Sequence, residues 1–138
     1  MRLRDNVRHF LITPARFVRA IEYMLALSTM TWGVILAHPF DVFSGAASWA
    51  TLKASPLSES AWAVLFVVLG LVKLMATWYR WQRIRRWGAF VAMAVWSGVG
   101  LSFFLLNPYS PGWSVYVTIF AGLNALTFVR LSLLREAS

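Results

Sequence analysis

The sequence feature that most constrains the fold is the stretch 78–87, which lies between two long apolar runs. Its sequence is WYRWQRIRRW, with four arginines and three tryptophans in ten residues. Arginine side chains stay in water or among lipid head groups, and tryptophan side chains prefer the boundary between head groups and hydrocarbon. A soluble core does not accommodate such a segment. We therefore interpret it as a basic turn at a membrane surface that joins two membrane spans.

The composition agrees with this interpretation. The chain has 138 residues, of which 59% are hydrophobic and 13% are charged, whereas soluble domains are about 25% charged. The apolar residues fall into four blocks, and each is close to the roughly 20 residues that cross a bilayer. We predict an all-α membrane protein with one membrane domain, built as two hairpins. Its four transmembrane helices are predicted at residues 17–37, 57–79, 87–106 and 113–129.

The segments between these spans carry weaker signals. Residues 1–13 place apolar side chains on one helical face, which predicts a short amphipathic helix on the membrane surface. A secretory signal is the alternative, but Glu22 interrupts the apolar run and no good cleavage site follows it. Residues 38–56 form an external loop in this scheme, with a short interfacial helix over 44–53. At its end, Ser55-Pro56 has the pattern of a helix cap followed by proline.

Lysine and arginine are distributed very unequally along the chain. Five lie before or at the start of the first span, four in the 80–86 turn and two near the C-terminus, against Lys53 alone in the external loop. The positive-inside rule then predicts that both termini and the turn are cytoplasmic. The turn residues facing anionic lipid head groups are Arg80, Arg83, Arg85 and Arg86. Because the cations gather at the ends of apolar blocks, nucleic acid is not an expected partner.

Small residues recur at every fourth position in three of the predicted spans. Such stripes let helix backbones approach closely, and this approach drives association in lipid. The stripes indicate either packing within one chain or self-association into larger assemblies. They are Thr29, Gly33 and Ala37 in the first span, Ala94, Gly98 and Ser102 in the third, and Ser114, Thr118 and Gly122 in the fourth.

Glu22 and Lys73 are the ionisable residues well inside the predicted spans. Antiparallel helices bring both to the cytoplasmic half of the membrane, so we predict an intramembrane ion pair between them. A proton or ion path is the alternative. Asn124 is predicted to form a hydrogen bond between helices.

The sequence gives no sign of catalytic or cofactor chemistry. It contains no cysteine, so thiolate metal sites and cysteine nucleophiles are excluded. His9 and His38 are predicted on opposite sides of the membrane and therefore cannot share a haem or a metal ion. We expect a protein that is not an enzyme and binds no cofactor or metal.

With four short spans, both ends inside and the basic turn at Arg80–Arg86, the chain resembles small four-helix inner-membrane proteins of bacteria and phages, among them holins. The resemblance covers the whole chain in outline and implies oligomerisation in the cytoplasmic membrane that ends in a permeability lesion. The long external loop and the weakly charged C-terminal tail depart from that pattern. The expected function is helix–helix association, as a holin-like pore former. The alternatives are an accessory subunit of a larger membrane complex and a small transporter or ion-conducting subunit.

Overall fold

The computed structural model describes residues 15–38, 53–109 and 111–136, and its regular structure is entirely helical. The elements are α2 (Ala15–Ala37), α5 (Glu59–Trp78), α6 (Gln82–Leu106), and a last helix that runs through α7 (Gly112–Ser114), the π-helical η2 (Val115–Ala121) and α8 (Gly122–Glu136). Four helices are long and apolar enough to cross a membrane, which confirms the all-α prediction. The predicted helix at 1–13 and most of the external loop lie outside the described residues.

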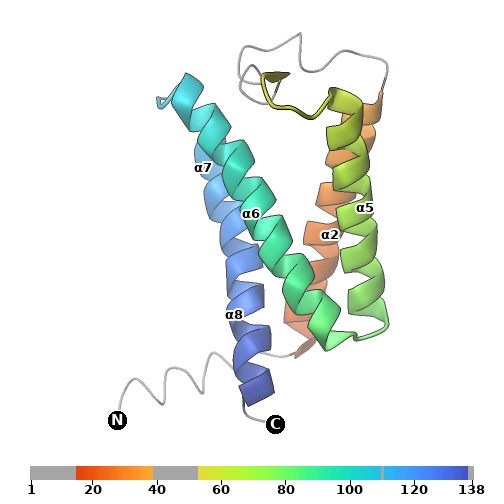
Figure 1. Ribbon diagram of the computed structural model, residues 1–138. Coiled ribbons are helices and arrows are strands. Elements are labelled where there is room, and N and C mark those ends of the chain that lie inside the picture. Colours follow the sequence, from red (N-terminus) through yellow and green to blue (C-terminus); the bar gives the residue numbers. More distant parts are fainter. Residues whose placement is uncertain (1–14, 39–52, 110, 137–138) are drawn as a thin grey trace.

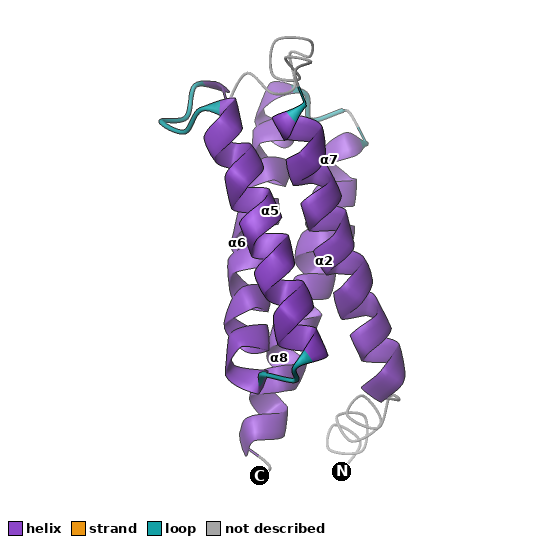
Figure 2. Ribbon diagram, turned by 90° about the vertical axis from the view of Figure 1, so that its right-hand side faces the viewer, coloured by secondary structure: helices purple, strands orange, loops and turns teal. Residues whose placement is uncertain are grey.

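The helices form two antiparallel hairpins. Figure 1 shows α2 beside α5, and α6 beside the last helix. The start of α2, the turn between α5 and α6, and the end of α8 all lie at the same end of the bundle (Figures 1 and 2). We call this the arginine end. The contact between α2 and α8 is much smaller than the contacts within each hairpin.

Two helix starts differ from the sequence prediction. Helix α5 begins at Glu59 rather than residue 57, because Ser58 is its N-cap and accepts a hydrogen bond from Ala61 N at 3.2 Å. Ser55, the predicted cap, instead accepts a hydrogen bond from the indole of Trp62 at 3.1 Å. Helix α6 begins at Gln82, five residues before the predicted start, so most of the basic cluster is helical. The last helix also continues beyond residue 129, to Glu136.

The turn between α5 and α6 is tight and uses an unusual residue. Arg80 has a φ of 57°, in the left-handed region, where a residue other than glycine is disfavoured by roughly 1–2 kcal/mol. The turn is closed by Trp81 N, which donates to Ala76 O at 2.9 Å, as in a Schellman motif. This geometry reverses the chain within three residues. The arginines that follow therefore belong to α6, which runs back along the bundle.

The first hairpin is held together by two glycines at a close helix crossing. A Cβ atom on Gly70 would overlap the Met30 side chain and lie 2.8 Å from the Ala26 carbonyl. A Cβ on Gly33 would meet Val67 at 2.6 Å. The predicted packing role of Gly33 is therefore confirmed. The role of Gly70 as its counterpart on α5 was not predicted.

The stripe predicted on the third span does not face the other helices. Ala94 and Gly98 are exposed, and a Cβ on Gly98 would meet no atom within 4 Å. Of the two interpretations of this stripe, packing within the chain is therefore wrong for Gly98, and self-association is not tested. The buried face of α6 instead follows the residues Ala89, Ala92, Trp96 and Val99, and the close glycine is Gly100, whose Cβ would lie 2.5 Å from Val117. Ser102 is buried and donates to Gly98 O at 2.9 Å.

The stripe predicted on the fourth span is also only partly realised. Thr118 is exposed and Ser114 is half-buried. Gly122 is half-buried, and the atom nearest to a Cβ there would be Val117 O of its own helix, at 3.5 Å. The reason is the π-helical segment, in which Gly122 N donates to Val117 O, five residues back. The wider turns break the four-residue spacing on which the stripe depended.

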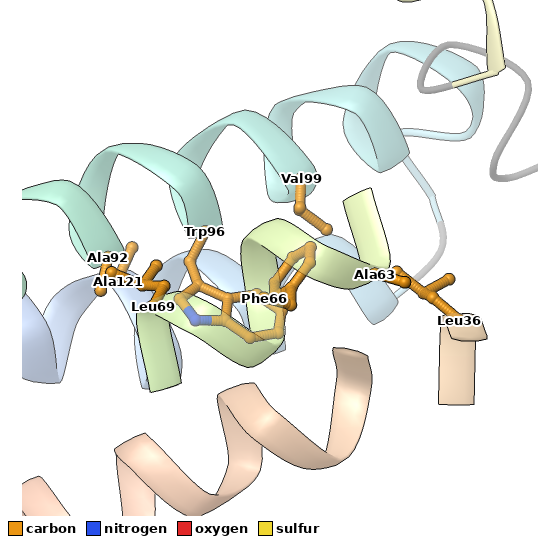
Figure 3. Close-up of a cluster of buried hydrophobic side chains, with 8 residues drawn as sticks. All are labelled: Leu36, Ala63, Phe66, Leu69, Ala92, Trp96, Val99 and Ala121. Atoms are coloured by element: carbon orange, nitrogen blue, oxygen red, sulfur yellow. The ribbon is translucent and has the colours of Figure 1, made fainter. Parts of the chain in front are cut away.

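Side chains from all four helices meet around Trp96. The buried cluster that contains Trp96 also includes Leu36 from α2, Phe66 from α5 and Ala121 from η2, with Phe66 beside the indole (Figure 3). Two rings of η2 stack on the indole: that of Phe120 with a centroid distance of 4.4 Å and that of Tyr116 with 5.7 Å. This aromatic cluster fills the middle of the bundle.

We predict that Gly70→Ala destabilises the protein and that Gly98→Ala does not. At residue 70 the new methyl group must push α2 and α5 apart, which typically costs about 1–3 kcal/mol. At residue 98 it enters open space. Thermal unfolding of the two variants in the same detergent measures the difference. An equal loss at both positions would contradict the close crossing of α2 and α5.

Candidate functional site

The best-defined polar feature is a buried ion pair between α2 and α6, close to the arginine end. Arg85 Nη2 lies 2.7 Å from Glu22 Oε2 and 2.9 Å from Glu22 Oε1, and Arg85 Nε donates to Oε2 at 3.0 Å. Both side chains are less than 10% exposed. The guanidinium therefore binds both carboxylate oxygens in the fork geometry that makes arginine–carboxylate pairs strong and directional.

Side chains from two further positions fix this pair. Thr77 Oγ1 on α5 lies 3.4 Å from Glu22 Oε2 and donates to Lys73 O at 2.9 Å. Gln82 Oε1 accepts from Arg85 Nη1 at 3.1 Å. The ion pair thus connects three helices and joins the first hairpin to the second.

The second buried charge, Lys73, belongs to a different contact. Its Nζ donates to Asn124 Oδ1, which bridges α5 and α8. The Asn124 amide nitrogen donates in turn to Phe120 O at 2.6 Å. Asn124 is fully buried. The predicted role of Asn124 as a hydrogen bond between helices is confirmed, with Lys73 as its partner.

The predicted ion pair between Glu22 and Lys73 is not formed. Glu22 pairs with Arg85 instead, although it still lies close enough to Lys73 to interact with it electrostatically. The physical reason is the early start of α6. This start makes Arg85 part of a helix that packs on Glu22, and arginine offers a better fork than lysine. Arg85 was predicted to face lipid head groups with the other turn arginines.

The rest of the basic cluster is more open. Arg80 and Arg83 are exposed and Arg86 is half-buried. Trp78, Trp81 and Trp87 surround them and are also exposed. Glu59, in the first turn of α5, lies at the opposite end of the bundle. The charged groups of the described chain are therefore concentrated at the arginine end.

A third polar contact joins α2 to the aromatic cluster. Thr29 Oγ1 accepts from the Trp96 indole nitrogen at 3.3 Å and donates to Leu25 O at 2.7 Å. Within the described residues, every buried side-chain nitrogen and oxygen has a hydrogen-bond partner. The buried side chains of Glu22, Lys73 and Thr29 thus all stabilise contacts between helices.

The geometry defines a class: a four-helix bundle with apolar outer faces and an interior that contains paired charges. No protein-family model, curated protein or solved structure matches this chain. The function must therefore be argued from the residues themselves. His38 lies at the end of α2 away from the arginine end, and His9 is outside the described residues. In the part of the chain that the structure describes, no three histidine, aspartate or glutamate side chains gather as metal ligands.

We predict a large coupling energy between Glu22 and Arg85. Glu22→Gln or Arg85→Gln alone leaves a buried charge without its partner, and such losses are about 3–5 kcal/mol. The double variant should recover part of this loss, with a coupling of about 1–3 kcal/mol. Unfolding in detergent by denaturant or heat measures the double-mutant cycle.

The matched control is the double-mutant cycle of Glu22→Gln with Arg86→Gln. Arg86 is the next residue of the same basic cluster, but the salt bridge of Glu22 in the described structure is to Arg85. The effects of these two substitutions should add. The cycle of Glu22→Gln with Lys73→Met should show only weak coupling. A stronger coupling to Lys73 than to Arg85 would restore the pair predicted from the sequence.

Proposed function

We propose that this chain is an integral membrane protein that is not an enzyme and that acts by helix–helix association. The observation that carries the proposal is the inverted polarity of the bundle. Large apolar side chains point outward along every helix, including Met24, Val64, Leu101 and Leu126, each more than 50% exposed. Apart from Lys53 and Glu59, the charged side chains of the described residues point inward or lie at the arginine end. Such an outer surface suits lipid and would aggregate in water.

Tryptophans at both ends of the bundle support membrane insertion. Trp78, Trp81 and Trp87 are exposed at the arginine end. At the other end, Trp62 donates to Ser55 Oγ and Trp113 donates to Pro108 O at 3.0 Å. Indoles with one apolar side and one polar contact favour the two interfaces of a bilayer. We propose that these two groups mark the limits of the hydrocarbon.

The proposed orientation places the arginine end in the cytoplasm of a bacterial cell. The four arginines of the turn and the arginines of α2 and α8 lie at that end. Eleven of the thirteen lysines and arginines of the sequence belong to the segments assigned to this side. A bias of this size orients short loops and termini toward the cytoplasm.

The outer face of α6 is the surface we propose for association. Ala94 and Gly98 are exposed one helical turn apart, with Leu101 and Leu105 exposed on the turns that follow. A glycine and an alanine leave a shallow surface against which a second helix packs closely in lipid. Self-association through this face would give a holin-like assembly. Association with a different membrane protein would make the chain an accessory subunit.

A small transporter or ion-conducting subunit is the second candidate, favoured by the buried charges Glu22, Arg85 and Lys73. Two observations weigh against conduction through a single chain. The charges are bound to one another or to Asn124, and the aromatic cluster around Trp96 fills the middle of the bundle. We therefore assign these charges to stability of the fold.

The topology is tested by reporter fusions after residues 53, 83, 110 and 138. We expect them to report outside, inside, outside and inside, because the arginine-rich segments remain cytoplasmic. An external signal at residue 83 would overturn the orientation of the whole chain.

The association face is tested by single-cysteine crosslinking, which is straightforward because the chain has no native cysteine. We expect Gly98→Cys to form a disulfide between chains in oxidised membranes. The control, Val64→Cys, lies on the exposed face of α5 and should remain monomeric. Equal crosslinking at both positions, or none at residue 98, would remove α6 as a self-association surface.

Induced expression in a bacterial host separates the two forms of association. A pore former should cause an abrupt loss of membrane potential. An accessory subunit should accumulate harmlessly and co-purify with a partner, and Gly98→Leu should abolish that co-purification because it closes the shallow surface on α6.

A further inference from the structure

A cavity of about 210 Å³ opens at the arginine end. It lies where α2, the turn, α6 and α8 come together. Its polar lining is Arg19, Arg80, Gln82, Arg85 and Arg130, and its apolar lining is Val18 and Leu131. Four guanidinium groups from separate parts of the chain thus converge on one space. One water occupies about 30 Å³ of liquid, so the cavity has room for an ion with several oxygen atoms.

The lining favours a phosphate-bearing anion. The guanidinium group donates two parallel hydrogen bonds, and this geometry matches two oxygens of a phosphate. None of the described lining residues is acidic. Arg85 binds Glu22 and Gln82. The cavity lining holds three further arginines, Arg19, Arg80 and Arg130. Each guanidinium has five N–H donors, and we assign the ligand contacts to these three side chains.

The nearby start of α6 adds to this preference. Its first turn contains no acidic residue, and its N-cap, Trp81, makes no side-chain hydrogen bond to the helix. The positive end of the helix dipole therefore favours negative groups from outside the helix, of which the Glu22 carboxylate on Arg85 is one. An anion in the cavity would be a second.

An apolar groove of about 320 Å³ between α2 and α8 lies beside the cavity. Val18 and Arg130 line both spaces. The walls of the groove are Phe17 and Ile21 on one side and Leu123, Leu126 and Thr127 on the other. It follows the small contact between the first and the last helix. A charged cavity beside an apolar groove has the two halves needed to hold an amphiphile.

We propose that this composite site binds one anionic phospholipid, with its phosphate among Arg19, Arg80 and Arg130 and an acyl chain between α2 and α8. The proposal rests on the membrane insertion proposed above. A free phosphate would occupy only the cavity. The position of the groove beside the cavity, with Val18 and Arg130 in both linings, is the observation that favours a lipid over a soluble anion.

The test measures lipid binding to the full chain in dodecylmaltoside micelles. Phosphatidylglycerol, phosphatidylcholine and inorganic phosphate are titrated separately, and thermal stabilisation gives the affinity. We expect phosphatidylglycerol to stabilise the protein and the other two to have little effect. Arg19→Gln and Arg80→Gln should each weaken binding about fivefold, since one arginine near an anionic membrane surface contributes about that factor. Arg80 is exposed, so its variant should fold normally.

Two matched controls separate a site from general surface charge. Arg16→Gln removes an exposed arginine from the same end of α2 that does not line the cavity, and binding should be unchanged. Leu126→Trp should obstruct the groove and weaken binding, whereas Val129→Trp, on the exposed side of the same helix, should not.

Three results would overturn the proposal. Equal losses for Arg16→Gln and Arg80→Gln would show unspecific attraction to charged micelles. Stabilisation by inorganic phosphate as strong as by the lipid would identify a soluble anion as the ligand. No stabilisation by any probe would show that the cavity binds none of them. None of these results depends on crosslinking at residue 98, so failure of the lipid site and failure of the association face are distinguishable.

Discussion

The ion pair between Glu22 and Arg85 is the interaction on which the arrangement of the two hairpins depends. Close glycine crossings hold each hairpin together from within, but the hairpins have fewer contacts with each other. In lipid there is little hydrophobic force to press them together, because acyl chains solvate apolar helix faces as well as other helices do. A bidentate pair that is shielded from water supplies a directional contact in its place.

Two kinds of contact hold the hairpins together, each at a different level of the bundle. Near the arginine end, polar contacts join the hairpins through Glu22, Arg85, Lys73 and Asn124. In the middle, the rings around Trp96 join them by shape and stacking. The polar contacts specify which residues face each other, since a shifted helix would bury a charge without a partner. The aromatic contacts supply area but tolerate more variation in position.

The number and class of the helices were predictable from the sequence, because the length of an apolar run and the position of arginines are local properties. The site was only partly predictable. Glu22, Lys73 and Asn124 were identified because a polar residue in an apolar run is conspicuous. Their partners were not, since Arg85 lies in a cluster whose other members face outward. The close contact of Gly100 was missed, and Gly98 proved to be exposed, because four-residue spacing does not indicate which helix face is buried.

The π-helical segment η2 lies between α7 and α8 in the last helix. It fixes the angle by which the side chains after it are rotated relative to those before it. Before it, Trp113 contacts the end of α6. After it, Asn124 faces Lys73. An α-helix turns by about 100° per residue, so loss of one residue within Val115–Ala121 would rotate everything that follows by about that angle. The chain would remain helical throughout, yet Asn124 and Arg130 would turn away from the partners and the cavity they now face. The number of residues between α7 and α8 is therefore as important to the fold as the identity of the residues on them.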